Sequence, residues 1–287
     1  HWLLRPVDEV FEMIEDNQMT LQSMSVSAQR APFVEEISAW ISKLSMLSDL
    51  LEQWLMCQKR WLYLEPVFHS GEISKQLPEE GKQYSWLERG WSQVMREAKS
   101  DPLVINHVSS RERLDKIVEC NRIIDRIEKG LVEYLDAKRA LFPRFYFLSN
   151  DDLLQILARS GDDDPQAVQR HLRKCFDNVD KLELTKDNAI TLAMVSQDGE
   201  RVEFCTPVPR PKNVEAWLVC AEQEMKSTMK AMIVRALGDY NDEKRTDWAR
   251  KWPGQAALAA SQIVWTRDVA AALSSTADPS GSIFSPL

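Results

Sequence analysis

The stretch "ISAWISKLSMLSDLLEQWLMCQKRWLYLEP", residues 37–66, decides the fold class. Its apolar residues recur at alternating spacings of three and four, which is the period of one face of a helix. The pattern predicts a single helix from about Pro32 to Leu64, roughly 45–50 Å long at 1.5 Å per residue. Pro66 is expected to end it. The stripe, with one polar interruption, comprises Ile37, Trp40, Leu44, Leu47, Leu51, Trp54, Gln58 and Trp61.

A second stripe with the same spacing and with flanking charges lies between residues 117 and 134. We expect this helix to pack against the first, and antiparallel packing fits the pattern. The segment between them breaks at Pro78–Gly81 and then predicts a helix that carries Trp86, Trp91 and Met95. The first 140 residues therefore read as a helical bundle. The members of the second stripe are Ile117, Cys120, Ile124, Ile127, Leu131 and Tyr134.

The stretch "FPRFYFLSNDDLLQIL", residues 142–157, crowds four aromatic residues around Arg144 and then turns polar. Aromatic rings beside one cation can form a binding site, but before a helix start they more often pack a core, and we favour the core. Ser149 with Asp152 has the spacing of a capping box, and Gly161 offers the helix a stop. The motif indicates an extended segment, a sharp turn and a short helix, that is, a joint. The candidate hinge comprises Phe142, Pro143, Arg144, Phe145, Tyr146, Phe147, Ser149 and Asn150.

After this joint, the spacing of the apolar residues changes from the helical period to alternation. A short helix with Val168, Leu172 and Phe176 inward precedes "AITLAMVSQDGERVEFCTPV", which predicts a β-hairpin over about residues 189–206. Asp198-Gly199 is a pair preferred in two-residue hairpin turns, where both residues need positive φ.

The buried face of this hairpin stays open at this level. Ile190, Leu192 and Met194 alternate along one strand, whereas a two-residue loop would place Val195 opposite Val202. The segment after Asp268 is rich in Ser and Ala and is expected to fray.

The helix that follows the hairpin should bury one face. The members of this face are Val214, Leu218, Ala221, Met225, Thr228 and Met232.

These patterns predict a mainly α fold in which elongated helical bundles form a rod-like arm with one inserted β-hairpin. Residues 1–141 should form an N-terminal helical bundle. Residues 142–272 should form a second part that contains the hairpin, and residues 273–287 a flexible tail.

Composition excludes several classes of function. The net charge of −8 and the pI near 5.2 argue against nucleic acid or an anionic membrane as the main partner. No stretch of about 20 apolar residues could span a bilayer, and we expect no secretory leader. The five cysteines include no CxxC pair, which fits a reducing compartment. The N-terminus begins in mid-pattern, so we expect a piece of a longer chain.

Catalytic signatures are absent from the sequence. It contains no GxxxxGK[ST], HExxH, GxSxG or GxGxxG motif. His69, His107 and His171 are scattered, and the acidic run Asp162–Asp164 lacks the spacing of a calcium loop. The methionines at 225, 229 and 232 read as core, although methionines also suit adaptable surfaces. We therefore expect no catalytic, cofactor-binding or metal-ligating residue in this chain.

Several blocks, taken together, resemble the linker region of dynein heavy chains over roughly residues 5–272. The sequences of residues 142–157 and 171–179 are more similar to the axonemal branch of the family than to the cytoplasmic one. The tail "SSTADPSGSIFSPL" does not resemble the family. The blocks are "EDNQMTLQSMSVS" (15–27), "WLYLEPVF" (61–68), "FPRFYFLSNDDLLQIL" (142–157), "VQRHLRKCFDNV" (168–179), "DGERVEF" (198–204), "NVEAWLVCAEQEMKSTM" (213–229) and "WPGQAALAASQIVWT" (252–266).

The resemblance implies a mechanical role. It implies a helical arm beside a ring of AAA+ modules in the same heavy chain, where ATP with Mg²⁺ would bind and where nucleotide would switch the arm between bent and straight forms. It implies dynein intermediate and light chains and microtubules as further partners, and a place in the axoneme of a cilium or flagellum, with the cytoplasm as the alternative. A static helical scaffold of spectrin or repeat type is the alternative function, although no internal period supports it.

Overall fold

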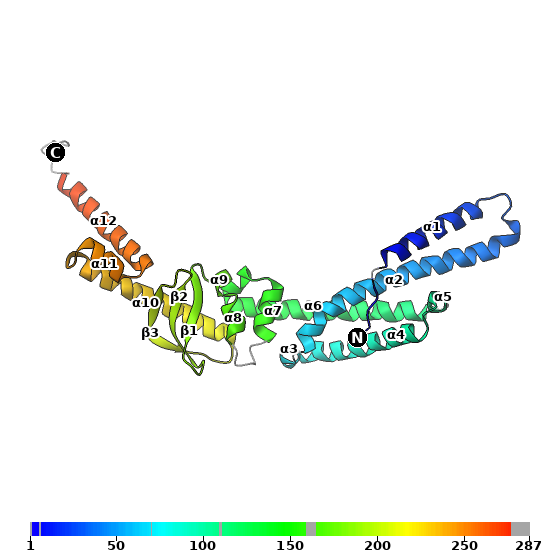
Figure 1. The fold of residues 1–287 in the computed structure, drawn as a ribbon, viewed down its shortest axis with the longest axis horizontal. Coiled ribbons are helices and arrows are strands. Elements are labelled where there is room, and N and C mark those ends of the chain that lie inside the picture. Colours follow the sequence, from blue (N-terminus) through cyan, green and yellow to red (C-terminus); the bar gives the residue numbers. More distant parts are fainter. Residues whose placement is uncertain (1, 6, 70, 109–110, 159–164, 277–287) are drawn as a thin grey trace. The chain divides into compact units, whose positions relative to one another are not determined.

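The computed structural model (Figure 1) describes residues 2–5, 7–69, 71–108, 111–158 and 165–276. The chain divides into two units, with the boundary between Ala137 and Lys138. The fold is mainly helical with a small antiparallel sheet, which confirms the predicted class.

The first unit is built from helices alone in its described residues. Its longest helix continues past Pro66, so the prediction that this proline ends it is wrong. The turn after Pro66 is held because Val67 and Phe68 are buried, and the Phe68 ring stacks on Tyr84 with centroids 5.0 Å apart. The elements are α1 (Asp8–Ser25), η1 (Ala31–Phe33), α2 (Val34–His69), α3 (Glu72–Gln76), α4 (Pro78–Ser100), α5 (Val104–His107) and α6 (Glu112–Leu141).

Helix α4 runs antiparallel to α2. Trp54 donates its ring N–H to the Met95 sulfur at 3.3 Å, whereas Phe68, two heptads further along α2, meets Tyr84 near the start of α4. Between these contacts the Trp61 and Trp91 rings stack with centroids 5.7 Å apart. The aromatic residues therefore form a continuous seam between the two helices.

Helix α4 is also antiparallel to α6, because Arg113 at the start of α6 pairs with Glu97 at the end of α4. At the other end, a Cβ on Gly130 would lie 2.3 Å from the Glu80 carboxylate, so Gly130 allows close approach. Two reversals of direction make α2 and α6 parallel, not antiparallel as expected. Helix α4, which lies between them in the sequence, packs antiparallel to both.

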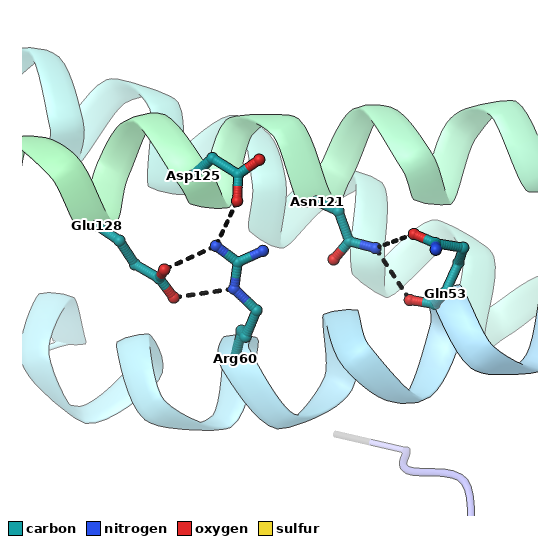
Figure 2. A network of polar contacts seen from close by, with 5 residues as sticks. All are labelled: Gln53, Arg60, Asn121, Asp125 and Glu128. Atoms are coloured by element: carbon teal, nitrogen blue, oxygen red, sulfur yellow. Dashed lines mark hydrogen bonds and ion pairs between the residues drawn. The ribbon is translucent and has the colours of Figure 1, made fainter.

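The side chains between α2 and α6 follow this parallel order (Figure 2). Asn121 Nδ2 donates to the Gln53 side-chain oxygen at 2.9 Å. About two turns along both helices, Arg60 pairs with Asp125 at 2.6 Å and with Glu128 at 2.7 Å. These polar contacts fix the register of the two helices.

The second predicted stripe is buried from Ile117 to Leu131, but in the first only Ile37, Trp54 and Trp61 are buried. The other apolar members of the first stripe, Leu44, Leu47 and Leu51, are half-buried, and α2 buries Leu50, Cys57 and Leu64 instead. Trp40 remains 46% exposed, although we expected it on the seam with Trp54 and Trp61, and Trp86 is also exposed. At the end of the second stripe, Leu135 is buried and Tyr134 only half-buried. The seam thus begins further along α2 than the sequence stripe.

The second unit combines helices with a sheet. Its helix α12 reaches Thr276, eight residues beyond Asp268, where fraying was expected. Residues 277–287, the rest of the expected tail, lie outside the described residues. The elements that follow α6 are η2 (Pro143–Phe147), α7 (Asn150–Ala158), α8 (Gln166–Gln169), α9 (Leu172–Cys175), β1 (Val179–Leu184), β2 (Ile190–Ser196), β3 (Arg201–Pro209), α10 (Val214–Gly238), η3 (Asp239–Asn241), α11 (Arg245–Lys251) and α12 (Gly254–Thr276).

The sheet has the order β1-β2-β3, so the predicted hairpin gains a third strand, β1. The loop between β2 and β3 has three residues, because the Gly199 N–H donates to Ser196 O and the Ser196 N–H to Glu200 O. Gly199 alone in this loop takes a positive φ, of 83°. This is the geometry of a turn followed by a glycine bulge, not the expected two-residue turn.

The longer loop shifts the register by one residue. Val195 pairs with Arg201, and Met194 pairs with Val202, so the proposed pairing of Val195 with Val202 is wrong. The more buried face of β2 carries Thr191, Ala193 and Val195. The alternation of larger residues at Ile190, Leu192 and Met194 belongs to the less buried face.

Helices α10 and α12 complete the second unit. Helix α10 buries most of its predicted face, including Val214, Leu218 and Met225. Ala260 of α12 packs in a cluster with Ala236 and Trp248. None of the described helices is both long and apolar enough to cross a membrane.

Candidate functional site: the aromatic joint

The predicted joint begins where α6 ends. Two residues with extended backbone, Phe142 (φ −134°, ψ 93°) and Leu148 (φ −99°, ψ 143°), flank the single 3-10 turn η2. The turn is closed by the Phe145 N–H, which donates to Phe142 O at 3.0 Å. The chain therefore turns within a few residues, through a small number of backbone torsions.

The aromatic residues of the joint divide into two groups. Phe142 and Phe145 are fully buried and meet edge-to-face, with ring centroids 5.0 Å apart. Phe142 also contacts Phe176, at 6.1 Å between centroids. Tyr146 and Phe147 are 65% and 68% exposed. The core interpretation holds for the first two rings and not for the last two.

Arg144 ties the joint to two other elements. Its Nη1 donates to Cys175 O at the end of α9, at 2.9 Å, and its Nε to Glu222 of α10, at 3.2 Å. Its guanidinium also lies 4.9 Å from the centroid of the Phe176 ring. A planar cation with several donors suits this combination of stacking and hydrogen bonding.

The last turn of α6 carries two further ties. Lys138 forms an ion pair with Glu215, a buried carboxylate in the first turn of α10. Arg139 Nη2 donates to Asn150 Oδ1 at 2.7 Å. The joint is thus fastened to α10 by Lys138 before the turn and by Arg144 within it, and the end of α6 is linked to the first residue of α7.

The helix that follows begins with the predicted capping box. The Asp152 N–H donates to Ser149 Oγ at 3.2 Å, and the Ser149 N–H to the Asp152 carboxylate at 3.4 Å. The same carboxylate accepts a hydrogen bond from Lys174 at 2.6 Å, and this contact chiefly holds the Asp152 pKa below its ordinary value. Burial lowers the pKa of the neighbouring His171. Gly161, the predicted stop, lies outside the described residues.

The sequence pattern predicts a turn at this place but not the partners that fasten it. Glu215 and Glu222 are more than 70 residues away from Lys138 and Arg144 along the chain. Neither carboxylate belongs to a motif, so no local signal could have found them. Their pairing depends on how α10 lies against the turn.

Groups that could hold a metal ion are not assembled in the described part of the chain. No cluster of three or more His, Cys, Asp or Glu is placed there to hold a metal ion. His107 contacts the Asp101 carbonyl and His171 contacts Asp152, in separate elements. The acidic run Asp162–Asp164 lies outside the described residues.

Comparison with known proteins gives consistent matches. The sequence profile of "Dynein heavy chain, N-terminal region 2" matches residues 1–236. Dynein axonemal heavy chain 1 of Homo sapiens is 44% identical over 272 residues, which are 95% of this chain and 6% of that protein. Dynein axonemal heavy chain 12 of Rattus norvegicus is 40% identical over 93% of this chain and 9% of that protein. For dynein axonemal heavy chain 3 of Mus musculus, the values are 39%, 94% and 7%. This chain therefore spans less than a tenth of these relatives.

Proposed function

This chain belongs to the family of dynein heavy chain N-terminal region 2, with axonemal-type relatives, and we propose that it is the mechanical linker of such a heavy chain. In this role it changes shape with the nucleotide state of the adjoining AAA+ ring and so contributes to microtubule-based movement in cilia or flagella. ATP with Mg²⁺ acts in the ring. Microtubules and dynein intermediate and light chains are partners of the complete motor.

The observation that carries this proposal is the continuous helix α6 followed directly by the fastened turn. Helix α6 runs without interruption from Glu112 to Leu141, through the boundary between Ala137 and Lys138. Its N-terminal part is linked by hydrogen bonds and ion pairs to α2 and α4. A stiff helix that ends in a turn with few free torsions suits a lever, because force on one end is not absorbed by bending along its length.

We place the hinge in residues 142–150. Rotation about the extended residues Phe142 and Leu148 would change the direction of the chain, as hinges commonly do at the ends of elements. The ion pairs Lys138–Glu215 and Arg144–Glu222 would then break in one form and re-form in the other. Shifting such a two-state element from mostly one form to mostly the other needs about 5 kcal/mol or less.

A static scaffold is the second candidate, and the same contacts favour it. The buried Phe142 and Phe145 rings and the three-way contacts of Arg144 fasten the turn to its neighbours. If these contacts persist in all nucleotide states, the joint is a rigid corner. A distance measurement across the joint in the complete motor separates the two functions.

Two fluorophores in the complete heavy chain would test the hinge. One is placed at Ser45 on α2 and the other at Cys220 on α10, both of which are exposed. We expect the transfer efficiency to differ between the nucleotide-free and ATP-bound motor. A double variant, Glu215→Gln with Glu222→Gln, should shift the ratio of the two forms. An unchanged distance would favour the rigid corner.

We also propose that this chain neither binds nor hydrolyses ATP by itself. The lack of a phosphate-loop motif in the sequence supports this. Isothermal titration of the 287-residue chain with Mg-ATP should give no heat of binding. Micromolar binding in this titration would contradict the proposal.

A further inference from the structure

The α1–α2 hairpin, residues 8–50, carries an apolar pocket near its turn. The pocket has a volume of about 420 Å³ and lies between the end of α1, the turn η1 and the start of α2. Leu21, Met24, Phe33, Ile37 and Trp40 supply its apolar walls. A pocket of this size can hold one or two large side chains of a partner.

The side chains around the pocket are exposed to an extent that the fold does not explain. Phe33 is 56% exposed and Trp40 46%, and the neighbouring Met24 and Val26 are also exposed. Trp40 lies on the heptad stripe of α2, at a position that further along the helix is filled by α4. Large aromatic residues left open in a concave apolar site are typical anchor positions of interfaces.

The α1–α2 hairpin as a whole is strongly acidic, whereas the pocket itself is lined by one acidic residue, Glu36, and one basic residue, Arg30. Residues 8–50 contain eight Asp and Glu against two Lys and Arg, a net charge of −6, and the chain as a whole carries −8. The eight carboxylates are all exposed, and Glu36 lines the pocket itself. The other members are Asp8, Glu9, Glu12, Glu15, Asp16, Glu35 and Asp49.

The two cations of the hairpin are already engaged. Arg30 donates to Ser25 O at 2.6 Å and so helps to close the turn. The Lys43 ammonium lies 5.1 Å from the centroid of the Trp40 ring. The ring therefore already accepts a cation on one face, which is the chemistry a basic partner would use.

Exposed methionines also occur elsewhere along α1. Met13 and Met19 are both more than 60% exposed. Flexible thioether side chains adapt to varied apolar faces, and acid-rimmed methionine surfaces suit basic amphipathic helices. Such a partner would match the pocket with its apolar side and the carboxylates with its lysine or arginine side.

We propose that the α1–α2 hairpin is a docking surface for a basic amphipathic helix of another protein. An apolar anchor of that helix fills the pocket between Phe33 and Trp40. Its cationic side faces the carboxylates of α1 and of the first turn of α2. This surface serves recruitment or attachment and is independent of the lever role of the joint.

The test uses the 287-residue chain and a fluorescein-labelled synthetic helix of sequence KLAKKLWKKLAKKLAK, followed by fluorescence anisotropy. We expect saturable binding that weakens as salt is raised, because the charges lie at the surface. The same residues in an order without helical periodicity should bind about tenfold more weakly. Equal binding of the two peptides would overturn the proposal, as would no binding.

Two matched pairs of variants locate the site. Trp40→Ala should weaken binding about tenfold, whereas Trp265→Ala, at a tryptophan 68% exposed in the second unit, should change it by less than about twofold. Glu36→Lys should weaken binding about fivefold, and Asp242→Lys, an equal charge change at an exposed site of the second unit, by less than about twofold. Unchanged circular dichroism would show that each variant folds. Equal effects within the pairs would mean general attraction to an acidic protein and would refute the site.

Discussion

The two units are stabilised in different ways. In the first, residues a few positions apart along α2 and α6 form apolar seams, and polar contacts such as Arg60 with Asp125 connect the helices. In the second, backbone groups at the sheet edges are satisfied by side chains from other elements. Gln169 exchanges two hydrogen bonds with the Leu182 backbone of β1, and Thr228 accepts one from the Cys205 N–H of β3.

The difference shows where sequence patterns are sufficient to predict how an element is stabilised. A helix satisfies its own backbone and leaves only its side-chain stripe to find a partner. An edge strand leaves a row of unpaired backbone groups that some other part of the chain must cover. The first unit is therefore expected to respond most to loss of apolar volume, and the second to loss of single long-range polar contacts.

Trp54→Ala should have the largest effect on the first unit. The ring is buried and donates to Met95, so its removal leaves a cavity in the seam, and we expect unfolding to become easier by about 3–5 kcal/mol. Trp40→Ala, at an exposed position of the same helix, is the matched control. Urea unfolding of the chain measures both, and similar midpoints for the two variants would contradict the seam.

Arg144→Met is the corresponding test in the second unit. It keeps an apolar stem but removes the donors to Cys175 O and Glu222, and we expect a loss of about 1–3 kcal/mol. Arg235→Met, at an exposed position of α10, should be close to neutral. If Arg144→Met were also neutral in urea unfolding, the joint would not be fastened by this residue.

Ser149→Ala removes the N-cap hydroxyl of α7. We expect a loss of about 1 kcal/mol, because the Asp152 N–H then lacks its side-chain acceptor. Ser149→Asp should restore most of the loss, since Asp is an equally good cap. Thermal unfolding followed by circular dichroism distinguishes these variants, and failure of Asp to rescue would argue against a capping role.

The pH dependence of stability should contain a contribution from Asp152. Its pKa is lower in the folded state than in the unfolded chain, chiefly because of Lys174. The stabilisation is therefore complete above the ordinary pKa of 3.8 and is lost as pH falls through the lower folded value. In thermal unfolding between about pH 6 and pH 2, Asp152→Asn should show a smaller decrease than the unchanged chain. Parallel curves would mean that Lys174 contributes nothing.

Gly130→Ala should have the smallest effect. The new Cβ would lie 2.3 Å from Glu80 Oε1, but that atom is the end of a flexible side chain that can move away. The gain in helix propensity, up to about 1 kcal/mol, should offset the displaced contact. Urea unfolding should show a change within about 0.5 kcal/mol. A large loss would mean that the Glu80 side chain cannot move.

The alternation of three and four along α2 and α6 was sufficient to predict both helices and most of the buried apolar face of α6, but in α2 it missed buried residues such as Leu50, Cys57 and Leu64. The spacing of Ser149 and Asp152 similarly determined the start of α7, because a capping box is complete within four residues. The sequence also predicted a turn at Asp198-Gly199, but not its length. A glycine permits several turn types, and the hydrogen bonds between the strands select one of them.

Some features depended on the tertiary structure alone. Helices α2 and α6 are parallel because α4, which lies between them in the sequence, packs antiparallel to both. A stripe of apolar residues does not specify which helix will cover it. The exposure of Trp40 and the pairing of Arg144 with Glu222 likewise depend on how segments distant in the sequence pack together. Sequence periodicity shows which face of an element is apolar, whereas the partner that meets this face, or leaves it open, is decided by segments far away in the chain.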